Sequence, residues 1–114
     1  KILQRIEMKK RIDRIVSIID EKKGENIEIF NLDNSDYIAK AVVIATTMGT
    51  KHGFALLNDL KTKLKPAGEH FLGIDESDDW SVIDLGDILI HLMSPEYREK
   101  YQLEKFLKNL KKGS

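Results

Sequence analysis

The chain has 114 residues, of which 41% are hydrophobic and 33% charged, a composition typical of an ordinary soluble globular protein. Its 19 basic residues balance 19 acidic ones, which argues against a protein that grips nucleic acid mainly through phosphates. Cysteine is absent, which excludes disulfides and cysteine-based metal sites, and no apolar run approaches the roughly 20 residues of a membrane span.

The length fits one domain, which we expect to comprise residues 1–112. Residues 113–114, Gly-Ser, are expected to be vector-derived, and no signal-like segment precedes the first predicted helix.

The first half of the chain predicts a helix followed by two strands. An amphipathic helix is expected over residues 2–22, where apolar residues recur at helical spacing, namely Ile12, Ile15, Val16 and Ile19. Gly24 is expected to end this helix in a left-handed cap. A strand is predicted over residues 27–32, and the apolar run 41–45 is typical of a central strand buried on both faces.

A second helix is expected over residues 51–64, with Thr50 as its cap. Its apolar stripe consists of Phe54, Leu57, Leu60 and Leu64. A short strand is predicted over residues 71–74, and residues 75–79 form an acidic loop.

Two further strands, over residues 80–84 and 87–93, are followed by a last helix. Ser94 is a favourable N-cap for that helix, and Pro95 suits its first position. Strands that alternate with helices in this way predict an α/β fold, a mixed sheet with helices packed on it.

The hairpin between the last two strands is the most informative segment. A two-residue loop of Leu85 and Gly86 is predicted there, because glycine tolerates positive φ. This loop pairs Asp84 with Asp87, Val82 with Leu89 and Trp80 with His91. Alternation then places these six side chains on one face, where an aromatic ring, an imidazole and two carboxylates favour a recognition surface.

Structural roles fit the same residues. Trp80 is equally suited to a half-buried core position, and a lone His91 is more often a structural histidine than a ligand. Asp84 and Asp87 also fit the start and the close of a turn, and Tyr101 fits packing of the last helix.

The alternative function class is a metal-dependent nucleotidyl- or phosphoryl-transferring enzyme that uses Asp84 and Asp87 as a carboxylate pair. No motif supplies a third ligand. The Walker pattern, the Asp-x-Asp pair of a nucleotidyltransferase and the nucleophile elbow are all missing from the sequence. The sequence therefore favours a binding protein without catalytic residues, metal or cofactor.

Over residues 27–107 the chain resembles the ribosome silencing factor, or iojap, family. The matching positions are Lys23, Ile27, Ile29, Val43 to Thr46, His52, Trp80, Asp84 to Asp87, His91, Arg98, Tyr101, Leu103, Glu104 and Phe106. The combination of Trp, Asp-x-Gly-Asp, His and a closing Arg-x-x-Tyr-x-Leu-Glu-x-aromatic pattern is highly specific.

The resemblance implies a fold similar to nucleotidyltransferases without their catalytic residues. It also implies a cytoplasmic translational repressor that binds the large ribosomal subunit through ribosomal protein uL14 and prevents the small subunit from joining. Partner-binding candidates carried over by position are Trp80, Asp87, His91, Arg98, Tyr101 and Glu104, with His52 as a secondary one. We expect little direct nucleic-acid binding and no membrane association, and a homodimer of the free protein is left open.

Overall fold

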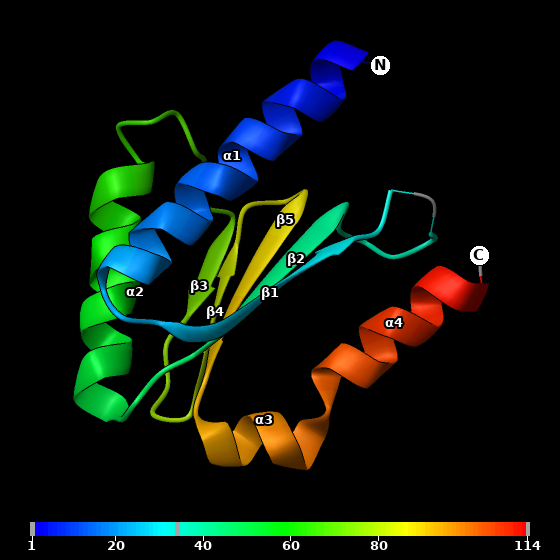
Figure 1. The fold of residues 1–114 in the computed structure, drawn as a ribbon. Helices are drawn as coiled ribbons and strands as arrows, with labels where there is room; N and C mark the ends of the chain where they lie inside the picture. Colours follow the sequence, from blue (N-terminus) through cyan, green and yellow to red (C-terminus); the bar gives the residue numbers. More distant parts are fainter. Residues whose placement is uncertain (1, 34, 114) are drawn as a thin grey trace.

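A computed structural model describes residues 2–33 and 35–113, with side chains described up to Leu110. In chain order the elements are α1 (Ile2–Glu21), β1 (Glu25–Asn31), β2 (Ala41–Thr46), α2 (Thr50–Leu64), β3 (Gly73–Asp75), β4 (Trp80–Asp84), β5 (Ile88–Met93), α3 (Pro95–Tyr101) and α4 (Leu103–Gly113) (Figure 1). Of the two residues expected to be vector-derived, Gly113 ends α4 and Ser114 lies outside the described residues.

The five strands form one sheet in the order β1-β2-β5-β4-β3. β2 and β5 run parallel, whereas the other neighbouring strands are antiparallel. Every residue of β2 and of β5 is buried, as expected for central strands that are covered on both faces. The predicted α/β fold with a mixed sheet is therefore confirmed.

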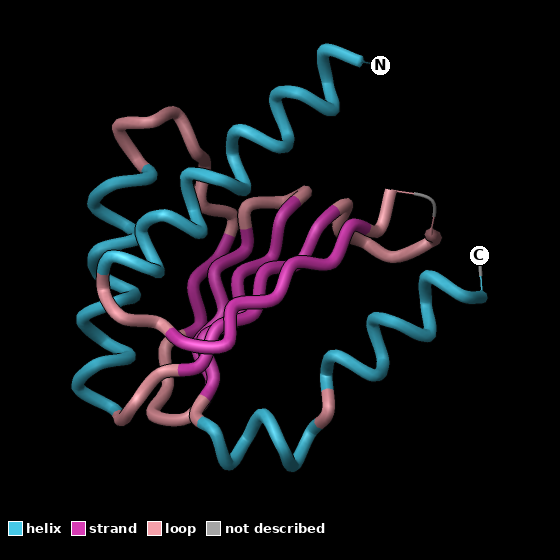
Figure 2. Tube along the Cα trace, in the orientation of Figure 1, coloured by secondary structure: helices cyan, strands magenta, loops and turns pink. Residues whose placement is uncertain are grey.

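Helices lie on both faces of this sheet (Figures 1 and 2). On one face α1 and α2 form a core with the odd-numbered residues of β2 and the even-numbered residues of β5. On the other face a second core joins residues of β1, β2 and β5 with those of α4, which contributes Leu103, Leu107 and Leu110. Both faces of the central strands are thus removed from water, which supplies most of the hydrophobic stabilisation.

The second helix differs from its prediction in two details. Gly49, not Thr50, is the N-cap, and no side chain caps the helix. Phe54 is 37% exposed, so its place in the predicted stripe is wrong. The buried stripe includes Gly53 and Leu56 instead, because the helix turns its glycine face towards Thr47 at the end of β2.

Helix α1 ends through close packing at Gly24. The left-handed residue is Lys23, with φ 67°, so the predicted left-handed glycine is wrong. Gly24 N–H donates to the Ile19 carbonyl at 2.9 Å. A Cβ on Gly24 would lie 2.3 Å from Ile19 Cγ2, so glycine is required here by the close approach of the chain to the buried helix.

The last helix begins as predicted, since the Ser94 side chain accepts from Tyr97 N–H and Pro95 occupies the first turn. It does not continue as one helix. Gln102, with φ 49°, separates α3 from α4 in a left-handed conformation. The chain consequently changes direction there, and α4 runs back along the sheet (Figure 1).

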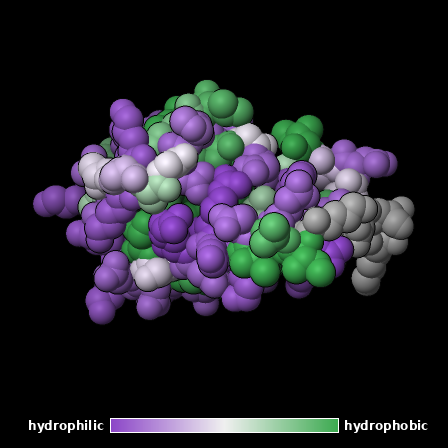
Figure 3. All heavy atoms as spheres, turned by 90° about the horizontal axis from the view of Figure 1, so that it is seen from above, coloured by the Kyte–Doolittle hydropathy of each residue, from purple (hydrophilic) through white to green (hydrophobic). Residues whose placement is uncertain are grey.

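Hydrophilic side chains predominate on the face seen from above, and hydrophobic ones form separate patches among them (Figure 3). The most exposed large apolar side chains are Ile2, Leu3, Ile38 and Leu72. Within the described residues, no helix combines the length and the apolar character needed to cross a membrane.

Substitution Gly24→Ala should lower the free energy of unfolding by about 1–3 kcal/mol, because the added methyl group overlaps the buried Ile19. Gly73→Ala is the matched control, since nothing lies within 4 Å of a Cβ at that position. Chemical denaturation of both variants measures the difference. Equal stability of the two would contradict the packing role of Gly24.

Candidate functional site

The turn between β4 and β5 lies one residue further along the chain than predicted. Leu85 N–H donates to the Ile88 carbonyl at 2.9 Å, so Gly86 and Asp87 form the two-residue loop. Gly86 has φ 92°, and the turns favoured in hairpins need positive φ at the first loop position. Asp84 Oδ1 also accepts from Gly86 N–H at 2.8 Å. The predicted Leu85–Gly86 loop is wrong, because the glycine occupies the first position of the two-residue loop and not the second.

The new turn changes the cross-strand pairs. They are Trp80 with Met93, Val82 with His91 and Asp84 with Leu89. Every partner has moved by two positions, an even number, so Trp80 and His91 still share one face of the sheet. Asp87, however, leaves the strand for the turn. The predicted grouping of Trp80, His91 and Asp87 on one patch is therefore wrong.

Trp80 and His91 are joined by a hydrogen bond. Trp80 Nε1–H donates to His91 Nδ1 at 2.9 Å, and the ring centroids are 5.9 Å apart. His91 is 8% exposed, and burial lowers its pKa to about 4. The imidazole is therefore neutral at pH 7 with its proton on Nε2, an atom that is buried and has no partner among the described residues. His91 thus orients the indole ring.

Helix α3 completes an aromatic surface, which we define as Trp80, Tyr97 and Tyr101. The Tyr101 ring centroid lies 5.2 Å from that of Trp80 and 5.3 Å from that of Tyr97. Lys100 Nζ lies 5.3 Å from the Tyr101 centroid. Tyr101 is 47% exposed while Trp80 is half-buried, so the surface offers aromatic area that is ordered but still open to contact.

The sheet beside the aromatic surface is only partly covered. Val82 and Asp84 of β4 are half-buried, and Asp75 of β3 is exposed and pairs with Val82 on the same face. The core to which α4 contributes lies over β1, β2 and β5 instead. The aromatic surface therefore continues into a polar, acidic strip along β4 and β3.

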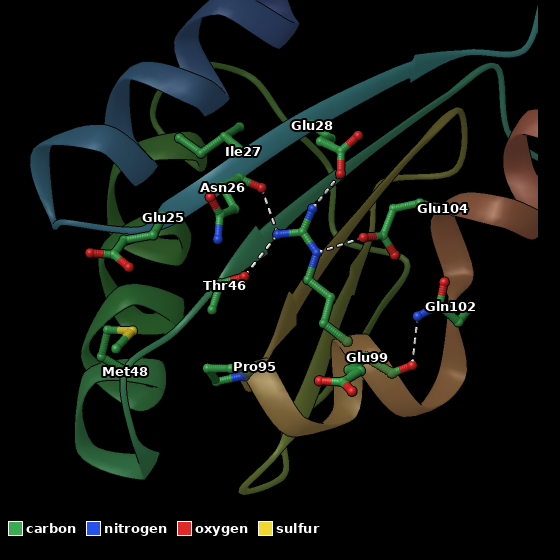
Figure 4. Close-up of a pocket in the computed structure, with 11 residues that line it drawn as sticks. Glu25, Asn26, Ile27, Glu28, Thr46, Met48, Pro95, Glu99, Gln102 and Glu104 are labelled. Atoms are coloured by element: carbon green, nitrogen blue, oxygen red, sulfur yellow. Dashed lines mark hydrogen bonds and ion pairs between the residues drawn. The ribbon is translucent and has the colours of Figure 1, made fainter.

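Arg98 lies inside the fold. It is 7% exposed, and its guanidinium donates to Glu104 Oε2 at 2.9 Å and to Glu28 Oε2 at 2.7 Å. It also donates to Thr46 Oγ1 at 2.8 Å and to the Asn26 carbonyl (Figure 4). These hydrogen bonds connect α3 with α4, β1 and β2. The structure therefore places Arg98 as an internal link rather than as an exposed contact.

Arg98 and Glu104 both line an open pocket between α3, α4 and β1, which has a volume of about 780 Å³ (Figure 4). Glu104 Oε2 bonds to Arg98, and its Oε1 is buried without a partner among the described residues. Its side chain is 22% exposed. Arg98 lies before the left-handed Gln102 and Glu104 lies after it, so the pair fixes the angle between α3 and α4.

Asp87 is held by Arg11 of α1. Arg11 Nη1 and Nη2 donate to the two Asp87 carboxylate oxygens at 2.7 and 2.9 Å. The same guanidinium donates to both oxygens of Glu69, each at 2.9 Å. These hydrogen bonds lower the pKa of the Asp87 carboxyl below its ordinary value and raise the pKa of Arg11. Asp87 therefore ties the hairpin turn to α1, away from Trp80.

Sequence reasoning missed Arg11 and Glu69. Arg11 lies four residues before the buried Ile15, on the same side of α1. An arginine beside the apolar stripe could therefore have been predicted to pair with an acidic side chain. Glu69 is 8% exposed in the segment after α2, and no sequence pattern distinguishes it from a solvated loop residue.

His52, the secondary candidate, joins two helices. Its Nδ1 accepts from Met48 N–H at 2.8 Å, and its Nε2 lies 2.6 Å from the Lys22 carbonyl oxygen. Since Nδ1 accepts, Nε2 is the nitrogen placed to donate, and the ring connects the end of α1 with the start of α2.

The carboxylate pair of the enzyme alternative is not assembled. Asp84 accepts from a backbone N–H of the turn, and both Asp87 oxygens accept from Arg11. In the part of the chain that the structure describes, no three His, Asp or Glu side chains form a group suited to a metal ion. The metal-dependent enzyme alternative is therefore not supported.

The chain is similar to proteins of a known family. A family model described as ribosomal silencing factor during starvation matches residues 5–113. The chain belongs to the ribosomal silencing factor family. This confirms the resemblance found in the sequence, and it supports a ribosome-associated role in the control of translation.

Relatives in this family match most of the chain. Ribosomal silencing factor RsfS of Haemophilus influenzae is 31% identical over 96 residues, which cover 82% of this chain and 94% of that protein. Mitochondrial assembly of ribosomal large subunit protein 1 of Mus musculus is 31% identical over 99 residues, which cover 82% of this chain and 43% of the mouse protein.

Solved structures share the fold. A crystal structure of a Chromobacterium violaceum protein superposes with a TM-score of 0.83 at 25% identity, covering 88% of this chain and 85% of that chain. A Bacillus halodurans protein gives a TM-score of 0.76 at 24% identity, covering 86% and 93%. The second match supports the fold alone.

Substitution Arg98→Lys should destabilise the protein by about 2–4 kcal/mol, because an ammonium cannot reproduce the forked hydrogen bonds to Glu28, Thr46 and Glu104. Arg14→Lys, at an exposed position of α1, is the matched control and should change stability by less than about 0.5 kcal/mol. Urea denaturation measures both, and similar losses would contradict the internal role of Arg98.

The stability of the protein should fall as pH decreases from about 6.5 to about 4. Over this range the unfolded His91 binds a proton that the folded residue, with its pKa of about 4, does not bind. The pKa difference corresponds to at most about 3 kcal/mol. Denaturation at several pH values should show that His91→Gln removes this slope while His70→Gln, at an exposed position, keeps it. Parallel pH profiles of wild type and His91→Gln would contradict the assignment.

Proposed function

We propose that this protein represses translation by binding the large ribosomal subunit through ribosomal protein uL14, which blocks joining of the small subunit. Family membership supports the ribosomal role, and the name of the mouse relative refers to assembly of the ribosomal large subunit. The observation that carries the proposal is the ordered, partly exposed aromatic surface of Trp80, Tyr97 and Tyr101.

Aromatic side chains of this kind are suited to anchor a protein interface. Tyrosine and tryptophan bury a large area with little loss of side-chain entropy, and they are enriched among residues that dominate binding energy. The hydrogen bond from Trp80 to His91 and the contact with Tyr101 fix the indole before a partner arrives. Such preorganisation lowers the entropy cost of binding.

The proposed contacts are mostly with protein. Residues 66–97, which include β3, β4 and β5, contain no lysine or arginine, so this side of the sheet is poorly suited to RNA phosphates. Little direct nucleic-acid binding is therefore expected along β3, β4 and β5, while Lys100 lies over the Tyr101 ring at the margin of the aromatic surface.

The sequence candidates take different roles in this proposal. Trp80 and Tyr101 contact the partner, and His91 orients Trp80. Arg98 and Glu104 position α3 and α4, and Asp87 fixes the hairpin turn on α1.

Other features implied by the family resemblance stay predictions. They are the likeness to nucleotidyltransferases, action by binding rather than catalysis, a cytoplasmic location and a homodimer of the free protein. The cytoplasmic location follows from a partner on the ribosome, and the homodimer is left open.

Substitution Trp80→Ala or Tyr101→Ala should weaken binding to large subunits by about 2 kcal/mol, roughly 30-fold, because each truncation removes an anchor. Phe54→Ala on α2 is the control, because that aromatic side chain is also exposed but belongs to a helix on the other face of the sheet from the aromatic surface. Co-sedimentation with purified large subunits gives the measurement, and circular dichroism checks the fold. Normal co-sedimentation of both variants would remove the aromatic surface from the interface.

The anti-association step is tested by adding small subunits. Wild-type protein should keep the subunits apart in a sucrose gradient, whereas Trp80→Ala should allow them to join. Stable binding of the protein to joined ribosomes would contradict a steric block.

A further inference from the structure

We infer that the outer edge of β3 pairs with an extended, basic segment of the protein partner, which adds a strand to the sheet beside the aromatic surface. This inference rests on the proposed function, from which it takes uL14 as the partner. Residues 72–76 are called the β3 edge below.

The β3 edge is open. β3 is the last strand of the sheet, and its three residues are all exposed. A terminal strand presents unpaired N–H and C=O groups on its outer side, and these groups form a template for another strand. At the opposite margin, β1 carries a register irregularity between Glu25 and Glu28, which disturbs regular pairing of an incoming strand.

Exposed apolar side chains accompany these backbone groups. Leu72 is 71% exposed and Ile74 is 38% exposed. Ile74 pairs with Ile83 and Asp75 pairs with Val82, so the Ile74 and Asp75 side chains point to opposite faces of the strand, and the side chains of an added strand would contact one on each face. Burial of the apolar side chains gives strand pairing at the β3 edge an apolar contribution beyond its main-chain hydrogen bonds.

Charge determines which strand fits. From Pro66 to Tyr97 the chain has no lysine or arginine, and the acidic residues there are Glu69, Asp75, Glu76, Asp78, Asp79, Asp84, Asp87 and Glu96. Four of these lie in the segment that begins at the end of β3. The zero net charge of the whole chain therefore hides an acidic sheet margin. Two copies of this margin repel each other, whereas a basic segment is attracted.

The β3 edge also adjoins the aromatic surface. Asp75 pairs with Val82, and Trp80 lies two residues from Val82 on the same face of β4. A partner that covers Trp80 is thus placed to reach the edge strand as well. One continuous interface would combine aromatic anchors, main-chain pairing and acidic side chains.

Hydrogen–deuterium exchange of the full chain, with and without isolated ribosomal protein uL14, tests the main-chain pairing. Strand addition predicts slower exchange of backbone amides in residues 72–76 in the complex. Binding that protects α3 and β4 but leaves the β3 edge unchanged would overturn this inference alone. If uL14 does not bind at all, the proposed function fails and the inference fails with it.

The charge match is tested with two triple variants of equal net charge. The first variant combines Asp75→Asn, Asp78→Asn and Asp79→Asn. Its Kd for uL14 should rise roughly tenfold at low salt, and the salt dependence of that Kd should fall. The control combines Asp13→Asn, Asp20→Asn and Asp36→Asn at exposed positions elsewhere and should bind nearly as wild type. Equal Kd values for the two triples would overturn the choice of a basic segment.

Discussion

The C-terminal part of the fold depends on one buried guanidinium. Arg98 belongs to α3, yet its hydrogen bonds reach β1, β2 and α4. A buried charge left without partners costs several kcal/mol, so the carboxylates of Glu28 and Glu104 are as necessary as the arginine. Because this cluster fixes α3 at the end of the sheet, it also determines where Tyr101 meets Trp80. The proposed contact surface therefore relies on a residue that does not itself face the partner.

Much of the fold could be predicted from the sequence because it follows from local patterns. The continuous apolar run of β2 identified a central strand, and Ser94 followed by Pro95 identified the start of α3. Alternation along β4 and β5 was enough to place Trp80 and His91 on one face, even though the register was wrong. The break at Gln102 had no such signal, since neither glycine nor proline marks it and the conformation is stabilised by the distant contacts of the Arg98 cluster.

The candidate site was harder to predict, because residue types at a given spacing do not show which way a side chain points. Asp87 matched the family pattern but turns to Arg11, which lies 76 residues away in the sequence. The net charge misled in a similar way. A balance of 19 basic and 19 acidic residues gave a net charge of zero, although all the lysine and arginine residues lie outside residues 66–97. Charge patterning along the chain carried more information than its sum.

We propose that the side of the protein formed by β4 and α3 faces the large ribosomal subunit. A cryo-electron microscopy map of large subunits saturated with this protein tests it most directly. We expect density over uL14 with Trp80 and Tyr101 in the contact and with α1 and α2 turned towards solvent. Density in which α1 or α2 forms the contact, or in which the protein lies away from uL14, would contradict it.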